Sequence, residues 1–211
     1  MRSTVLSRSS EPQSAPHLDL GEPATAPLQR LEPQIVRSAA PREPQLVFLC
    51  NPITGAAQEA ELDWGLIPNF EKSWPSIRPI NARAETIREK RIFAESYRLR
   101  RCVVPMSSYF QKDGSGKRHT IGRADGQLFG VAGIWDSWTD PDTKQVIRTF
   151  ASITVAANTL IAPIHDRMPA ILENTEFRRW FGEEEDPFDL LRPYPAERMS
   201  VVAGRTKPRL F

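Results

Sequence analysis

Strand-like segments dominate this chain, and helices do not alternate with them in the regular order that produces a parallel, doubly wound sheet. Apolar runs and alternating apolar and polar residues mark the strands, and turn signals such as Asp113–Gly116 separate them. One long helical pattern covers Glu85–Arg100, and Asn174 can cap a short amphipathic helix through Trp180 that stops at Gly182. The predicted strands are Leu46–Cys50, Arg101–Pro105, His119–Gly122, Gln127–Trp135 and Arg148–Ala156. We therefore expect an α+β fold with a mixed core.

Residues 1 to about 44 differ from the rest in composition, because they are rich in Pro, Ser, Ala, Glu and Gln and poor in aromatics. Such a segment cannot bury enough apolar surface to order itself. The whole chain has 211 residues, of which 40% are hydrophobic, and this suffices for a sizeable core. We find no internal repeat, P-loop or dinucleotide-binding fingerprint. One globular domain with a tail is therefore expected.

The formal net charge is only +2, so a nucleic-acid surface on this chain must concentrate its positive charge locally. No run approaches the length that spans a bilayer, and residues 1–30 lack the apolar segment of a secretory signal. Cys50 and Cys102 lie in apolar runs, which predicts buried thiols rather than a metal site or a disulfide scaffold. A location in the reducing cytoplasm fits these features.

The segment Pro163–Pro169 sets an imidazole, a carboxylate and a guanidinium side by side between two prolines. The prolines restrict the backbone, so we expect His165 and Arg167 on a stiff extended loop that aims both side chains. A histidine moves protons near neutral pH, and an arginine holds phosphate or carboxylate by two parallel hydrogen bonds. An ordinary charged turn is the alternative interpretation of this segment alone.

A second polar cluster, Asn81–Thr86, opens the long helical pattern. It places an amide, the guanidinium of Arg83 and the carboxylate of Glu85 within one turn of the predicted helix N-terminus. Free backbone N–H groups and a partial positive charge at such a terminus suit phosphate. Upstream, Trp64–Pro68 adds an aromatic side chain next to a turn. The second cluster therefore predicts a phosphate-binding site.

These three segments and Arg101–Pro105, in this order and spacing, resemble the SOS response-associated peptidase family, also called the abasic-site processing proteins. The resemblance covers roughly residues 24–203, because Ala24–Gln29 resembles the family's loop before its second strand. It implies a mainly antiparallel, barrel-like β core flanked by helices. We accordingly expect a disordered tail at residues 1–23 and a single domain at residues 24–211.

The family's chemistry is specific. Its members recognise abasic sites in single-stranded DNA and cross-link to them through a cysteine directly after the initiator methionine, whose thiol and α-amine form a thiazolidine with the sugar aldehyde. They are also described as peptidases that remove their own initiator methionine. The resemblance implies active-site roles for Asn81 and His165 and phosphate binding by Arg83 and Arg167. It implies a cytoplasmic, nucleoid-associated monomer that acts on DNA without a metal or organic cofactor and without a membrane.

Two departures from the family pattern affect the expected chemistry. The family begins Met-Cys-Gly-Arg, whereas this chain begins Met1-Arg2-Ser3-Thr4, and an internal cysteine cannot replace the nucleophile because its nitrogen is tied up in a peptide bond. Where the family reads Gly-Phe-Tyr-Glu-Trp, this chain reads Ser108–Lys112, so Gln111 takes the place of the active-site glutamate. An amide cannot transfer a proton as a tuned carboxyl does. We expect a DNA-damage protein with impaired covalent chemistry.

Two alternatives stay open at this point. One is a peptidase or lyase that keeps catalysis through His165 and another nucleophile. The other is a non-catalytic interaction protein that retains only the fold.

Aromatic and basic residues give weaker signals for DNA binding. Trp64 and Trp74 flank the approach to Asn81 and are the first candidates for stacking on unpaired bases, although most tryptophans pack in cores. Basic residues on and after the helical pattern could form a phosphate track. A solvated helix face balanced by glutamates is the favoured interpretation for Arg88–Arg91. The basic residues are Arg88, Lys90, Arg91, Arg98, Arg100 and Arg101.

Overall fold

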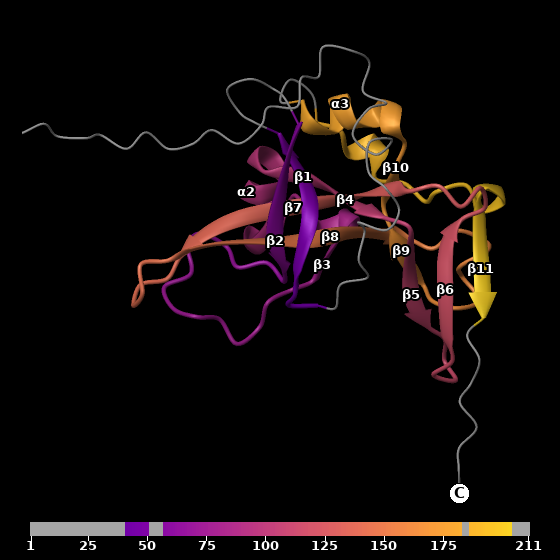
Figure 1. The fold of residues 1–211 in the computed structure, drawn as a ribbon, viewed down its shortest axis with the longest axis horizontal. Coiled ribbons are helices and arrows are strands. Elements are labelled where there is room, and N and C mark those ends of the chain that lie inside the picture. The colour runs from indigo at the N-terminus through magenta and orange to yellow at the C-terminus, as the bar shows by residue number, and fades with distance from the viewer. Residues whose placement is uncertain (1–40, 51–56, 183–185, 204–211) are drawn as a thin grey trace, which may run out of the picture.

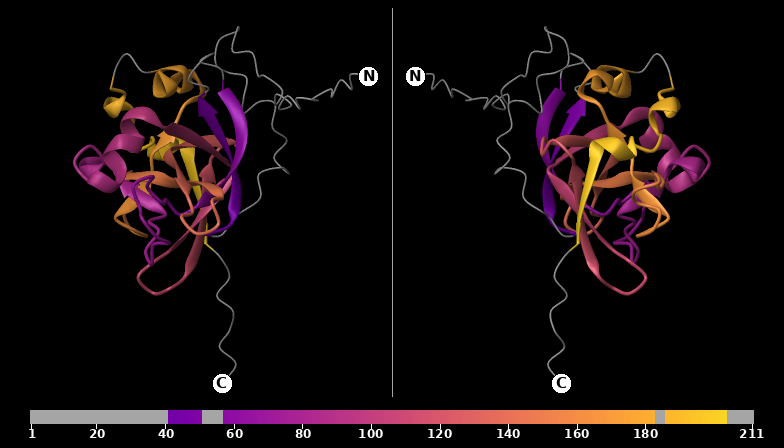
Figure 2. Two further views of the ribbon diagram at one scale, coloured as in Figure 1. Left: turned by 90° about the vertical axis from the view of Figure 1, so that its left-hand side faces the viewer. Right: turned by 90° about the vertical axis from the view of Figure 1, so that its right-hand side faces the viewer.

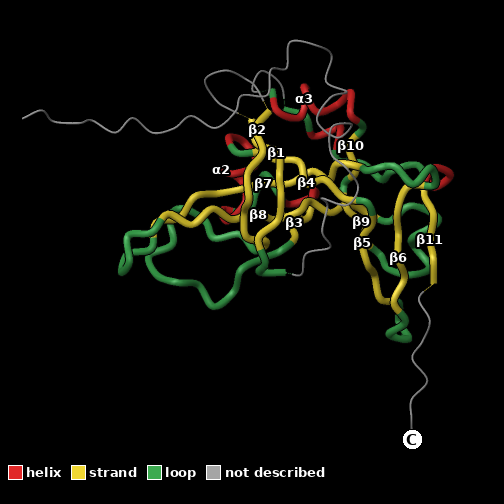
Figure 3. Tube along the Cα trace, in the orientation of Figure 1, coloured by secondary structure: helices red, strands yellow, loops and turns green. Residues whose placement is uncertain are grey.

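The computed structural model describes residues 41–50, 57–182 and 186–203. Strands make up most of this part of the chain, and short helices lie against them (Figures 1 and 3). The α+β class expected from the sequence is confirmed. The predicted tail at residues 1–23 and the predicted domain start at residue 24 lie outside the described residues.

The main sheet closes into a barrel-like ring. Its strand order is β10-β7-β4-β1-β2-β8-β3, and β7 pairs with β8 as well, so β7, β4, β1, β2 and β8 form a closed circuit. The pairings are antiparallel except those of β8 with β2 and β3, which are parallel. The strands are β1 (Pro44–Cys50), β2 (Ala57–Trp64), β3 (Asn81–Arg83), β4 (Arg101–Met106), β7 (Phe129–Thr139), β8 (Val146–Ala156), β9 (Arg167–Pro169) and β10 (Ile171–Leu172). The barrel-like core implied by the resemblance is therefore present.

Strand β4 shows why the ring forms the core. All six of its residues are buried, as expected for a short apolar run with neighbours on both edges. The Cys102 side chain is fully buried, and burial raises the pKa of its thiol far above the usual range. The predicted buried, unreactive thiol is thus confirmed for Cys102, whereas Cys50 at the end of β1 is half-buried.

The predicted helix over Glu85–Arg100 is wrong in its first six residues. A 3-10 turn, η1 (Ala84–Thr86), follows β3 directly, and the α-helix α2 covers only Arg91–Leu99. Ala84 and Ile87 are buried, so this stretch packs on the sheet instead of starting a solvent-facing helix. Lys90 has an extended backbone and separates the two helical pieces. The expected helix N-terminus at the polar cluster does not exist.

Helix α2 packs on β7 through Phe93, Ser96 and Tyr97. The Ser96 hydroxyl donates to the Asp136 carboxylate at 3.2 Å. Figure 2 shows α2 on the opposite side of the barrel from β1 and β2. The helix therefore covers one outer wall of the barrel.

A second short helix ends near the position predicted for it. α3 (Phe177–Phe181) follows the 3-10 turn η2 (Asn174–Glu176), and Gly182 terminates it. The N-cap of η2 is Glu173, in a reciprocal capping box with Glu176, so it lies one residue before the predicted Asn174. Two further 3-10 turns, η3 (Phe188–Leu190) and η4 (Ala196–Arg198), lead to the last strand.

A smaller antiparallel sheet stands beside the ring, in the order β11-β6-β5 (Figure 1). One of its faces carries Ile121 and Met199, which are buried in the hydrophobic core, and the other exposes Phe110 and Val202. We call the buried side the inner face of the second sheet. Its strands are β5 (Ser108–Lys112), β6 (Arg118–Arg123) and β11 (Met199–Ala203).

Candidate functional site

Two polar clusters that are far apart in the sequence meet on strand β8. β3 pairs with β8 in parallel and sets Asn81 beside Ser152, with Arg83 two residues further along. β9 pairs with the other edge of β8 and sets Arg167 beside Ala156. Paired residues point to the same face of a sheet, and alternate residues of one strand share a face. Asn81, Arg83 and Arg167 therefore lie on one face, within about 13 Å along β8.

Arg167 is held by a carboxylate from the other cluster. Its guanidinium donates to both Glu85 carboxylate oxygens, at 2.6 and 2.8 Å, and to the Thr154 carbonyl at 2.6 Å. The hydrogen bond from Arg167 is the main reason why the pKa of Glu85 is lowered from its ordinary value. Glu85 therefore stays ionised at neutral pH, and the charge of Arg167 is largely neutralised.

The loop before β9 orients His165. The backbone N–H of Arg167 donates to Nδ1 of the imidazole at 2.9 Å, while the Asp166 carboxylate lies 3.1 Å from the same nitrogen. The two contacts require different protonation states of the ring. Nδ1 accepts the Arg167 N–H only when it carries no proton, and it donates to Asp166 only when it carries one. In the neutral ring that accepts from Arg167, the proton sits on Nε2. The half-exposed imidazole then offers an N–H donor to a ligand.

Asn81 and Arg83 are both exposed at this face. The Arg83 side chain makes no hydrogen bond or ion pair with the described residues, in contrast to that of Arg167, although its charge helps to lower the pKa of Glu85. Beside Asn81, the Ser152 hydroxyl is buried and has no hydrogen-bond partner in the described part of the chain. The sequence pattern of β8 did not mark Ser152, because a single serine in an apolar strand carries no signal of its own. This part of the site combines an exposed cation with a buried hydroxyl that has no hydrogen-bond partner among the described residues.

Gln111 comes from the second sheet. It shares the inner face with Ile121, because β5 and β6 pair Tyr109 with Ile121 and Gln111 with His119. Its side-chain amide donates to the carbonyl of Lys112 at 3.3 Å. The loop that carries His165 adjoins this sheet, since the Asn158 amide donates to the Met199 sulfur at 3.3 Å. A shared role of Gln111 with Asn81 and His165 stays a prediction.

The two tryptophans expected to stack on bases differ in their surroundings. The Trp64 indole donates to the Ile80 carbonyl at 2.8 Å and stacks on Phe150 with ring centroids 6.2 Å apart. Trp64 therefore packs against the core. Trp74 is 53% exposed and meets the edge of Trp138.

Trp74 nevertheless lies away from the polar face. Trp138 pairs with Ile147 on β8, five positions from Ser152, and an odd separation along a strand reverses the face. Trp74 packs on Trp138 and so belongs to the face opposite Asn81. Trp64 pairs with Phe150, two positions from Ser152, and so lies on the Asn81 face. The structure therefore places Trp64 and Trp74 on opposite faces.

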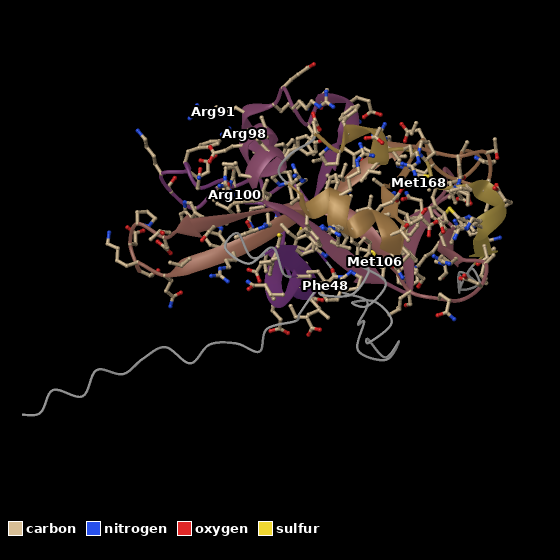
Figure 4. The ribbon with its side chains drawn as sticks, turned by 90° about the horizontal axis from the view of Figure 1, so that it is seen from above. Phe48, Arg91, Arg98, Arg100, Met106 and Met168 are labelled. Carbon is tan, nitrogen blue, oxygen red and sulfur yellow. The ribbon has the colours of Figure 1, made fainter. Side chains whose placement is uncertain are left out.

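The basic residues near α2 are mostly committed to protein contacts. Arg88 pairs with Asp186 at 3.0 Å, and Arg91 lies over the Phe70 ring. Arg100 lies 3.1 Å from the Asp136 carboxylate, and Arg101 is buried. Figure 4 shows Arg91 and Arg98 on the outer side of α2, with Arg100 nearer the sheet. This arrangement favours the solvated-face interpretation over a phosphate track.

Other classes of site leave little trace in the described residues. No three His, Cys, Asp or Glu side chains there gather closely enough to hold a metal ion. Within the same residues, no helix has the length and apolar character needed to cross a membrane.

Comparisons with known proteins agree with the fold and identify the family. The family model described as SOS response associated peptidase (SRAP) matches residues 9–206. The abasic site processing protein YoqW of Bacillus subtilis is 33% identical over 150 residues, which cover 67% of this chain and 66% of YoqW. The abasic site processing protein HMCES of Pongo abelii is 32% identical over 181 residues, covering 68% of this chain and 51% of HMCES. The matches thus span just under two thirds of the first relative and about half of the second.

Solved structures show the same similarity. A protein from Bacteroides thetaiotaomicron matches with a TM-score of 0.71 at 32% sequence identity, over 78% of this chain and 75% of that one. A protein from Bordetella bronchiseptica matches with a TM-score of 0.67 at 26% identity, over 80% of this chain and 87% of that one.

Proposed function

This chain belongs to the SOS response associated peptidase family, and from that membership we propose that it binds single-stranded DNA at abasic sites. The observation that carries the proposal is the shared sheet face of Asn81, Arg83 and Arg167, with His165 beside them. An exposed, uncommitted arginine next to hydrogen-bonding side chains suits a phosphate and the sugar attached to it.

We assign the residues of the face different tasks. Arg83 binds a phosphate. Arg167 and Glu85 form an ion pair that fixes this edge of the sheet face, and the Arg167 backbone N–H holds His165. Asn81 and the Nε2–H of His165 hydrogen-bond the abasic sugar. Gln111 keeps the volume of a glutamate in this site, but its amide cannot transfer a proton as the glutamate carboxyl would. Covalent cross-linking and peptidase activity are therefore impaired in a chain of this sequence.

Trp64 and Trp74 have smaller parts in this proposal. Trp64 supports the core below the site, and Trp74 contacts DNA only if a strand continues around the edge of the barrel. We further propose that the protein acts as a monomer in the cytoplasm, at the nucleoid, and that it needs no metal or organic cofactor. A peptidase or lyase with another nucleophile is the remaining enzymatic alternative.

Replacing Arg83 with Ala is expected to weaken single-stranded DNA binding by about three- to tenfold. It should also flatten the dependence of log affinity on log salt by about 0.7, which corresponds to one phosphate on a single strand. Fluorescence anisotropy titrations at several salt concentrations measure both quantities. Arg88→Ala is the matched control and should change less, because Arg88 already pairs with Asp186. Unchanged binding in both Arg83→Ala and Arg167→Ala, with the fold intact, would leave a non-catalytic interaction protein as the better account.

Replacing Glu85 with Gln is expected to strengthen single-stranded DNA binding severalfold, because it releases the Arg167 guanidinium from its carboxylate. The slope of log affinity against log salt should steepen by about 0.7, which corresponds to one further phosphate contact on a single strand. Glu89→Gln removes an equal charge from an exposed neighbouring position and separates a local effect from a change in net charge. Equal gains in the two variants would show that the released Arg167 guanidinium does not reach the strand.

A further inference from the structure

The inner face of the second sheet carries a polar row beside the core. Tyr109 and Gln111 of β5 stand across from Ile121 and His119 of β6. The Tyr109 hydroxyl and Nδ1 of His119 are both buried and have no hydrogen-bond partner among the described residues. A buried acceptor without a partner is costly, so an unused one calls for a ligand or an ordered water.

His119 is held in one orientation by a carboxylate. Its Nε2 lies 2.7 Å from the Asp113 carboxylate, and only 12% of the His119 side chain is exposed. Asp113 is itself fixed, because its other oxygen accepts from the backbone N–H groups of Ser115 and Lys117 and from the Ser115 hydroxyl. The hydrogen bonds from His119 and then Ser115 lower the pKa of Asp113 well below its usual range, so the carboxylate stays ionised.

An ionised carboxylate only accepts hydrogen bonds, so the proton of the neutral imidazole sits on Nε2. Nδ1 is then a lone-pair acceptor on His119, the residue that pairs with Gln111 across β5 and β6. Such an atom can bind only a group that donates a hydrogen bond. A DNA phosphate diester has no donor, and the nearby charge of Asp113 opposes it. An abasic residue has no base N–H, which leaves the hydroxyl groups of its sugar.

We propose that Nδ1 of His119 accepts a hydrogen bond from a hydroxyl on the opened sugar of an abasic residue. This inference rests on the proposed function and deepens it, because it gives the proposed site a group that distinguishes the abasic sugar from other parts of the strand. Gln111 lies across from His119 and offers its amide to the same sugar. The Asp113–His119 pair thus supplies an oriented hydrogen-bond acceptor on the inner face of the second sheet, where Gln111 replaces the family's glutamate.

Two stable oligonucleotides test this inference without covalent chemistry. One carries a borohydride-reduced abasic residue, whose sugar is open and bears a C1′ hydroxyl. The other carries a tetrahydrofuran residue, which lacks that hydroxyl. The protein is expected to bind the reduced abasic strand about tenfold more tightly, and His119→Phe should remove that preference by weakening binding of the reduced abasic strand far more than binding of the tetrahydrofuran strand.

Two further variants separate this role from a purely structural one. Thr120→Val removes a hydroxyl from the opposite face of the same strand and should keep the preference. Asp113→Asn keeps the imidazole but permits the other tautomer, and it should reduce the preference only in part. If His119→Phe unfolds the protein, the partial loss of preference expected for Asp113→Asn is the test of the role of His119.

Equal binding of both strands by the unmodified protein, or a preference that survives in His119→Phe, would overturn the role of His119. In that case, binding to the tetrahydrofuran strand that still depends on Arg83 leaves the proposed function standing. Failure to bind either strand overturns both.

Discussion

A protein of the printed sequence is expected to give no heat-stable adduct with abasic single-stranded DNA. A thiazolidine needs a thiol and an amine on one residue, and arginine follows Met1 in this sequence. Arg2→Cys together with Gln111→Glu should restore an adduct once Met1 is removed, provided that the cysteine reaches the site. Gln111→Glu alone should give none, because it supplies no nucleophile. Arg2→Cys alone should react at least about a hundredfold more slowly than the double variant, since it lacks the proton-transfer group.

Denaturing gels of heated reactions with an abasic oligonucleotide measure this outcome. Arg2→Ser with Gln111→Glu is the matched control, because it offers an amine and a hydroxyl in place of the thiol. Borohydride added during the reaction traps a reversible Schiff base of the α-amine, which heat alone would hide. A heat-stable adduct formed by the unaltered sequence would contradict the account of impaired chemistry.

Replacing Arg101 with Ala is expected to destabilise the fold by about 3 kcal/mol, a fall in Tm of roughly 10 °C. The buried guanidinium donates to the carbonyl groups of Trp180, at 2.6 Å, of Tyr97, at 3.0 Å, and of Gly182. It therefore ties the end of α2 to the end of α3 through the first residue of β4. Its loss leaves several carbonyls without a charged donor in a poorly hydrated place.

Thermal unfolding followed by circular dichroism measures this effect. Arg98→Ala is the control, because Arg98 is exposed three residues earlier and its loss should cost no more than about 0.5 kcal/mol. Arg101→Lys should fall between the two, since one ammonium group cannot reach all of these carbonyls in the planar geometry of a guanidinium. A Tm for Arg101→Ala within a degree or two of the unaltered protein would show that these hydrogen bonds contribute little.

Local patterns predicted the strands better than the helices. β4 and β8 are apolar over several residues, and such runs form central strands of a sheet irrespective of which strands pair with them. The helical period after Glu85 was misleading, because Ala84 and Ile87 are buried and this stretch forms a 3-10 turn, η1, instead of the first turns of an α-helix. Tertiary packing therefore decided the backbone where periodicity alone favoured a helix.

The candidate site was only partly visible in the sequence. Asn81, Arg83 and Arg167 could be singled out by composition and resemblance, and their shared face depends on a strand register that no local pattern encodes. Arg101 looked like a surface cation because burial of an arginine depends on carbonyl groups that lie far away in the chain. The Asp113–His119 pair escaped notice for a similar reason, since it forms only when the hairpin closes.

Hydrogen–deuterium exchange with and without a tetrahydrofuran-containing single strand maps where the DNA lies on the protein. We expect the strongest protection in peptides that contain Asn81–Glu85 and His165–Arg167. We expect little change in α2, where Arg88 and Arg91 already contact protein groups. Protection centred on α2, with the β3 and β9 peptides unchanged, would contradict the proposed function.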